Sequence, residues 1–197
     1  MNRRSILRSF AYAAFFACVL TTSFACGGGG GDDTPSGILT ATFTPDNPNP
    51  GANTVSMQAG SSSATDFNID VSVTQTNDVF GAAFDVTFPS ASVSYQSFDM
   101  TGSLLNGAGV TVSTTVDPFA PGRLIVAVTR VQNVGGTVPS VDVGATAKLI
   151  TLRFRARTAF LPTAISFDAT QPRQVRNELN QSIPVTWSSG SAAAAIN

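Results

Sequence analysis

FNIDVSVTQTNDVFGAAFDVTF, residues 67–88, alternates apolar and polar side chains in two runs that a short polar segment separates. Successive side chains of a β-strand point to opposite faces, so this period of two predicts two strands with one buried face each. The residues expected on the buried side are Phe67, Ile69, Val71, Val73, Phe80, Ala82, Phe84, Val86 and Phe88.

Other runs repeat the pattern, and turn-forming segments such as PDNPNPGAN and DPFAPG separate them. No sustained helical period follows residue 25. Many short strands at this spacing predict an all-β protein, an antiparallel β-sandwich of jelly-roll or Ig-like type. The further strands are expected at 37–43, 109–116, 123–130, 149–157, 164–167 and 183–187.

The length of 197 residues leaves room for one ordinary domain, which we expect to span residues 38–188. The segment that follows it, 189–197, reads SGSAAAAIN. Because this sequence is of low complexity, we expect it to be a disordered tail.

Residues 1–25 have the features of an export signal. MNRRSILR is cationic, and SFAYAAFFACVLTT is an apolar run of signal-peptide length that is too short and too interrupted for a permanent membrane span. The Ala25–Cys26 pair, followed by five glycines, resembles a bacterial lipoprotein signal. This resemblance implies that Cys26 is acylated and becomes the new N-terminus, although the family usually has Leu where this chain has Ser23. The alternative is ordinary cleavage, which leaves Cys26 as an unpaired thiol.

Two observations favour lipidation of Cys26. Cys18 lies within the signal, so Cys26 is the only cysteine of the mature chain, and a lone exposed thiol is a liability in an oxidising compartment. Residues 26–37 are also rich in glycine, as a flexible tether requires. We therefore expect a lipid-anchored protein of the bacterial cell envelope, at the outer membrane or cell surface.

The composition argues against catalysis and against nucleic-acid binding. The chain contains no histidine, and Glu178 is its only glutamate. The general base, the metal ligand and the carboxylate pair that enzymes use most often are therefore missing or scarce. After residue 25 the chain has 8 basic and 12 acidic residues, a net charge of −4, so it offers no basic stripe for a nucleic acid.

The strands at 67–88, GRLIVAVTR (122–130), KLITLRFRAR (148–157) and AISF (164–167) together resemble the cohesin family, a relative of carbohydrate-binding sandwiches. The resemblance covers most of residues 55–187. It implies a jelly-roll-like sandwich of about nine strands that binds a protein partner, the dockerin, on one flat sheet face.

The resemblance also implies where the partner binds. In cohesins the strand that matches 80–88 contacts the dockerin, which makes its outward residues Gly81, Ala83, Asp85 and Thr87 partner-binding candidates. Gly81 and Ala83 stand where the family has polar residues that hydrogen-bond the partner helix. The resemblance therefore supports the cohesin fold more strongly than it supports dockerin binding.

Arg153, Arg155 and Arg157 alternate on the outward side of their strand, and we expect Lys148 and Arg130 near them and Gly81 and Ala83 beside them. Such a row is suited to an acidic protein or an anionic polysaccharide. The alternative is a solvated sheet face whose charges are neutralised by carboxylates on neighbouring strands.

Two further sets of residues have a functional and a structural interpretation. Asp46, Asn47 and Asn49 carry oxygen ligands that suit calcium, but turn chemistry explains them directly. Trp187, Tyr95 and Phe119 suit sugar stacking, but core packing is the favoured interpretation.

The sequence thus predicts a non-catalytic, lipid-anchored surface module without a cofactor, which holds a protein partner at the cell envelope; the cohesin resemblance implies that this partner bears a dockerin. The alternative is a carbohydrate-binding lipoprotein associated with polysaccharide binding or degradation.

Overall fold

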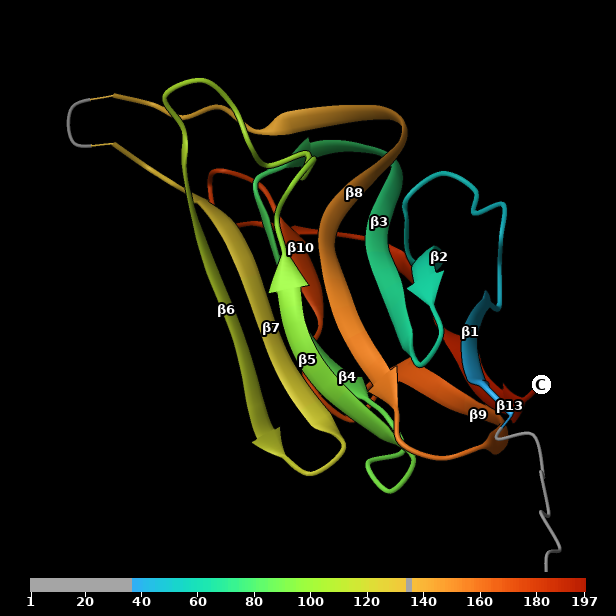
Figure 1. Cartoon of the computed structure of the whole chain (residues 1–197). Helices are drawn as coiled ribbons and strands as arrows, with labels where there is room; N and C mark the ends of the chain where they lie inside the picture. Colours follow the sequence, from blue (N-terminus) through green and yellow to red (C-terminus); the bar gives the residue numbers. More distant parts are fainter. Residues whose placement is uncertain (1–36, 134–135) are drawn as a thin grey trace, which may run out of the picture. The chain divides into compact units, whose positions relative to one another are not determined.

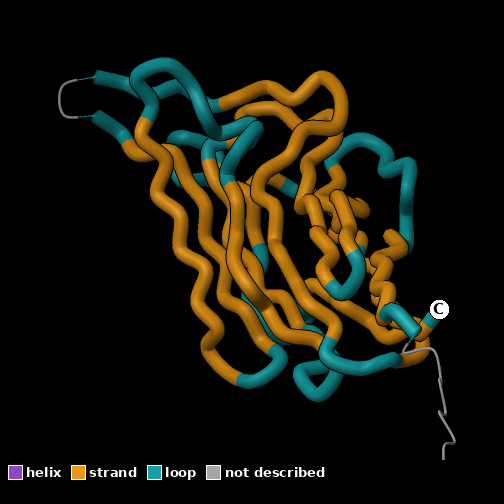
Figure 2. The backbone as a smooth tube through the Cα atoms, viewed as in Figure 1, coloured by secondary structure: helices purple, strands orange, loops and turns teal. Residues whose placement is uncertain are grey.

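The computed structural model describes residues 37–133 and 136–197. The expected signal peptide, Cys26 and nearly all of the tether lie outside the described residues. Within them the secondary structure is strand and loop, as Figure 2 shows, and no helix is present that could cross a membrane.

Thirteen strands in the described residues form two sheets that face each other as a sandwich (Figure 1). The eight-stranded sheet contains β1 (Leu39–Pro45), β13 (Gly190–Ile196), β9 (Phe160–Phe167), β4 (Gly81–Thr87), β10 (Gln174–Arg176), β11 (Ser182–Ile183), β7 (Arg123–Val131) and β6 (Thr111–Ala120). The five-stranded sheet contains β12 (Thr186–Ser188), β2 (Thr54–Ser63), β3 (Asp66–Val79), β8 (Val141–Ala156) and β5 (Val93–Asp99).

The predicted sandwich is confirmed, with more strands than the nine or so expected. Along the described residues the strands pair antiparallel except for β12, which runs parallel to β2. The strand expected at 183–187 is divided, because Ile183 belongs to β11 in the eight-stranded sheet and Trp187 to β12 in the five-stranded sheet. One edge of β4 is shared by two strands: β9 pairs with its end at Val86 and Thr87, whereas β10 pairs with its beginning at Gly81–Ala83.

The alternation quoted at the outset defines the core. The side chains expected to point inward on β3 and β4 are buried and join one cluster with the inward residues of β7 and β8. The largest fully buried members are Phe67, Phe84, Phe154, Met57, Ile69, Leu124, Leu149, Ile150, Leu152 and Ile165, together with Leu105 from a loop.

The prediction that residues 189–197 form a disordered tail is wrong. Residues 190–196 are β13, which lies between β1 and β9 and pairs with both. Small residues suit this position: a Cβ on Gly190 would lie 2.3 Å from the Cζ of Phe43, and Ala192 is fully buried. The folded domain therefore extends to the end of the chain and not to residue 188.

The two ends of the domain are held together. β1 and β13 pair along their whole length, from Leu39 opposite Ile196 to Pro45 opposite Gly190 (Figure 1). Beyond the last of these pairs, the backbone amide of Ile38 donates to the carbonyl of Asn197 at 3.0 Å, and the amide of Asn197 donates back at 3.1 Å.

Candidate functional site

The structure places the predicted partner-binding residues on two opposite faces. Gly81, Ala83, Asp85 and Thr87 lie on β4, whereas Arg153 and Arg155 lie on β8 in the other sheet, with Arg157 just beyond its end. Both sets point away from the shared core. The prediction that Gly81 and Ala83 lie beside the arginine row is therefore wrong, because alternation along a strand does not determine which sheet the strand joins.

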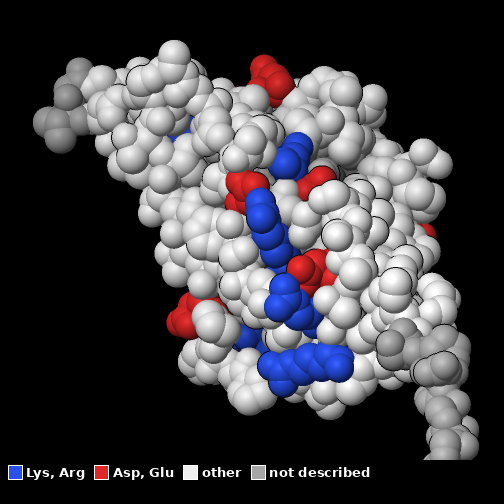
Figure 3. Space-filling view, in the orientation of Figure 1, with Lys and Arg blue, Asp and Glu red and all other residues white. Residues whose placement is uncertain are grey.

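The outer face of the five-stranded sheet, which we call the ion-pair face, carries a row of cations flanked by carboxylates (Figure 3). Arg155 binds Asp66 through two parallel bonds, Nε to Oδ1 at 2.5 Å and Nη2 to Oδ2 at 2.9 Å. Arg153 Nη2 donates to Asp99 Oδ2 at 2.5 Å. Cross-strand neutralisation of these two arginines, the alternative interpretation of the row, is confirmed.

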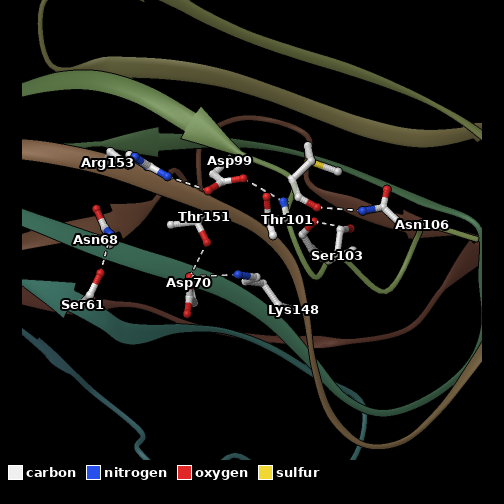
Figure 4. A network of polar contacts seen from close by, with 12 residues as sticks. Ser61, Asn68, Asp70, Asp99, Thr101, Ser103, Asn106, Lys148, Thr151 and Arg153 are labelled. Carbon is white, nitrogen blue, oxygen red and sulfur yellow. Dashed lines mark hydrogen bonds and ion pairs between the residues drawn. The ribbon is translucent and has the colours of Figure 1, made fainter.

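The same face continues as the hydrogen-bond network drawn in Figure 4. Asp70 accepts a bond from Thr151 Oγ1 at 2.5 Å and lies 4.0 Å from Lys148 Nζ. Asp99 also accepts the backbone amide of Thr101 at 2.8 Å. A polar hollow of about 360 Å³ borders Arg153 and Arg155, but the guanidinium groups that reach it are already paired.

Hydrogen bonds lower the pKa of two carboxyl groups on this face. The backbone amide and side chain of Thr101, followed by Arg153, bring the pKa of Asp99 to about 2. The hydrogen bond from Arg155 lowers the pKa of Asp66, and the same bond raises the pKa of Arg155. Both carboxyl groups are therefore charged at neutral pH, and the face keeps its alternating signs.

Two basic residues do not share this arrangement. Arg130 is buried on β7 in the other sheet, where its guanidinium donates to the carbonyls of Leu105 and Pro139, so the expectation that it extends the row is wrong. Arg157 does extend the row beyond β8, and it is the one member of the row without a carboxylate partner in the described residues.

The outer face of β6, β7 and β4, which we call the small-residue face, has a different chemistry. Gly81 lies opposite Thr129 and Ala83 opposite Ala127, and β6 adds Ser113 and Thr115 beside them. A Cβ on Gly81 would lie 2.8 Å from the Cβ of Thr129, so only glycine fits there without displacing its neighbour.

Asp85 differs from the other outward residues of β4 because it is nearly buried. Its carboxylate accepts two bonds from Arg123, of which the Nε to Oδ2 bond measures 2.7 Å. Since burying a carboxylate without such a partner is energetically costly, Asp85 pairs with Arg123 within the domain and does not face a binding partner as a free carboxylate.

A groove of about 260 Å³ crosses the small-residue face at the start of β4. Its floor is small and apolar, and the β10–β11 hairpin forms a polar rim over it. Gln174 and Arg176 on this rim pair with Ala83 and Gly81, respectively, so the rim places polar groups next to the strand positions that lack them. The lining consists of Phe80, Gly81, Ala82, Ala83, Ala127, Val128, Thr129, Gln174, Arg176, Asn177, Glu178 and Asn180.

Arg176 is held within the rim and leaves one donor unused. Its Nη1 donates to both oxygens of Asn180, and its Nη2 donates to Gln174 Oε1 at 2.7 Å. Its Nε is buried and has no acceptor among the described residues. The sequence contained no signal for this rim, because QPRQVRNELNQS shows neither a motif nor clear alternation.

The calcium candidates and Trp187 have structural explanations. Asn47 Oδ1 accepts the amide of Asn49 at 3.2 Å, which is turn chemistry, and the described residues contain no group of three carboxylates or other titratable metal ligands. Trp187 packs on Phe84 and Phe167, with ring centroids at 5.8 and 4.9 Å, so the core interpretation of this residue is confirmed.

Comparisons with known proteins agree with this fold. Neither protein-family models nor curated proteins match the chain. Among solved structures, the second type II cohesin module of the ScaA scaffoldin of Acetivibrio cellulolyticus is 11% identical, with a TM-score of 0.53, over 81% of this chain and 92% of that module. The sixth cohesin of scaffoldin B of the same organism, solved in complex with a mutant Cel5 dockerin, is 14% identical, with a TM-score of 0.50, over 77% and 96%. The described residues therefore form a cohesin-like β-sandwich.

Proposed function

We propose that this chain is a non-catalytic module that binds a protein partner through its small-residue face and the adjoining groove. The observation that carries the proposal is the contrast between the two outer faces. On the ion-pair face, Asp66, Asp99 and Asp70 already engage three of the four cations. On the small-residue face, Gly81, Ala83 and Ala127 form an apolar floor, beside which the hydroxyl of Thr129 donates to the carbonyl of Arg130.

The shape and chemistry of this face suit a partner helix. Small side chains allow another backbone to approach closely, and a flat apolar centre with a polar rim is the usual composition of a protein interface. Gly81 and Ala83 replace the polar residues with which cohesins hydrogen-bond their partner. Gln174, Asn177 and Asn180 of the rim lie next to these two positions. The similarity to a cohesin solved with a dockerin supports a partner of that kind.

The test is capture of partners by the full chain in detergent, with calcium and with a chelator, followed by identification of the retained proteins. We expect calcium-dependent retention of proteins with paired calcium-loop repeats. Ala83→Arg places a charged side chain on the groove floor and is expected to weaken the affinity for the captured protein at least about tenfold, measured by calorimetry.

Ala145→Arg is the matched control, because Ala145 is exposed on β8 in the other sheet. This variant is expected to bind as the parent does. If both variants lost affinity for the captured protein equally, or if Ala145→Arg alone lost it, the partner would not bind through the small-residue face. If Arg155→Glu abolished capture while Ala83→Arg did not, the partner would dock on the ion-pair face.

We further propose that Cys26 carries a lipid that anchors the module at the bacterial cell envelope, on the outer membrane or cell surface. The support is the sequence Ala25–Cys26 with its glycine-rich tether. In cells fed an alkyne-tagged fatty acid, the parent chain is expected to take up the label and to fractionate with membranes. Cys26→Ser is expected to lose both properties, and a Cys18→Ser variant, altered within the signal, is expected to keep them. Equal labelling of the Cys26→Ser chain would overturn the anchor.

A further inference from the structure

A third hollow, separate from the small-residue face, opens between β5, the β4–β5 loop and the β6–β7 turn. Its volume is about 560 Å³, within the range of small-ligand sites. The lining brings together Tyr95 and Phe119, two of the three aromatic residues considered above for sugar stacking, with Arg157, the unpaired member of the cation row.

Backbone hydrogen bonds tie the walls of this cavity to one another. The amide of Phe88 donates to the carbonyl of Gly122 at 2.8 Å, which joins the β4–β5 loop to the β6–β7 turn. The amide of Arg157 donates to the carbonyl of Ser92 at 2.8 Å, which joins the end of β8 to the start of β5. The cavity is thus formed before any ligand enters, which limits the ordering cost of binding.

The aromatic side chains are also held in place. Phe88 and Tyr95 both pack on the buried ring of Phe154, with centroids 5.4 and 5.9 Å away. Arg123 lies 5.3 Å from the centroid of Phe119, and Asp85 fixes the guanidinium of Arg123. Phe119 nevertheless remains 63% exposed, so much of its ring is open to a ligand.

Three polar side chains of the cavity are unused, whereas Ser94 already bonds Arg155 and Gln96. Within the described residues, the hydroxyls of Tyr95 and Ser90 have no hydrogen-bond partner, and the guanidinium of Arg157 has neither a hydrogen bond nor a carboxylate. A rigid aromatic surface, two free hydroxyls and one free guanidinium therefore converge on one opening.

We propose that this cavity binds an acidic sugar residue of a polysaccharide, a uronate. The ring of Phe119 packs against the C–H face of the sugar, the hydroxyls of Tyr95 and Ser90 hydrogen-bond its hydroxyl groups, and Arg157 binds its carboxylate through paired bonds. The site lies apart from Gly81 and Ala83, so it does not depend on the proposed protein-binding face.

The combination of groups favours a sugar over an acidic peptide. Both ligands carry carboxylates, Arg157 is the one unpaired cation of the row within the described residues, and residues 26–197 have a net charge of −4. Long-range attraction for polyanions is therefore absent, and affinity has to come from the local combination of ring, hydroxyls and guanidinium.

The test is calorimetric titration of the full chain in detergent with polygalacturonate, with the neutral polymer dextran and with polyglutamate. We expect binding to polygalacturonate alone. Arg157→Gln is expected to weaken it at least about tenfold, because a charge-assisted bond is lost, and Phe119→Ala roughly fivefold. The matched controls are Arg153→Gln, an arginine paired outside the cavity, and Phe98→Ala, a partly exposed phenylalanine outside it; both are expected to bind as the parent does.

Three results would overturn the proposal: no binding of polygalacturonate, binding that Phe119→Ala and Arg157→Gln leave unchanged, or equal binding of polyglutamate. The last result would assign the cavity to acidic peptides. Thermal unfolding of each variant, compared with the parent, separates loss of the site from loss of the fold. Because capture of a protein through Ala83 is measured independently, failure here leaves the proposed function intact.

Discussion

A chain that ends at Ser189 is expected to lose cooperative folding at room temperature. The deletion removes β13 from between β1 and β9, so both neighbours lose their hydrogen-bonded partner. It also uncovers the core around Ala192 and Ala194, which are buried. The loss should be on the order of 5 kcal/mol or more, comparable with the whole stability of a domain of this size. Urea denaturation followed by far-UV circular dichroism measures it.

A chain that lacks Ile196 and Asn197 alone is the control for this deletion. Ile196 is 64% exposed, so removing these two residues is expected to reduce the free energy of unfolding by about 1 kcal/mol or less. If the chain ending at Ser189 unfolded at the same urea concentration as the parent, residues 190–197 would not be an essential strand of the sheet.

Phe154→Ala is expected to lower the free energy of unfolding by about 3–5 kcal/mol, the usual cost of removing a large buried aromatic ring. Phe154 is fully buried and is the common neighbour of three aromatic rings: Phe67 at 5.7 Å, Phe88 at 5.4 Å and Tyr95 at 5.9 Å. The measurement is the urea midpoint at an unchanged slope, since an altered slope would indicate a change in the unfolded ensemble.

Phe98→Ala serves as the comparison, because Phe98 is a phenylalanine on β5 that is 40% exposed. Its free energy of unfolding is expected to fall by less than about 1 kcal/mol. Similar losses in the two variants would mean that the ring cluster around Phe154 contributes no more than a surface residue does.

Alternation in the sequence was sufficient to predict the fold class and the long central strands. It worked for β3, β4, β7 and the second half of β8, because each has one face on the core and one face in solvent. It did not reveal β5, where a bulge between Tyr95 and Ser97 shifts the period, or β2, where serines occupy both faces of the far half.

The strand β13 was missed for a different reason. Alanine and glycine are poor strand formers and give no pattern of large and polar side chains. Here the neighbouring elements determine the structure: Phe43 leaves no room for a side chain at Gly190, and the strands on both sides provide hydrogen-bond partners. Tertiary contacts of this kind cannot be inferred from local sequence.

The same limit applies to the candidate sites. The outward direction of Arg153 and Arg155 could be predicted, but their partners Asp66 and Asp99 come from strands whose register the sequence does not state. The cavity that joins Tyr95, Phe119 and Arg157 gathers residues from three separate parts of the chain. Its polar groups are unremarkable one by one, and only their proximity suggests a ligand.

The pairing of Ile38 with Asn197 has a consequence for how the domain can be built into a longer protein. Since the chain enters and leaves at one place, a host polypeptide could carry the whole sandwich within a single surface loop without its own ends being forced apart. Joining the two ends and opening the chain at another turn would likewise preserve both sheets. The order in which the strands are synthesised is therefore separable from the way in which they pack.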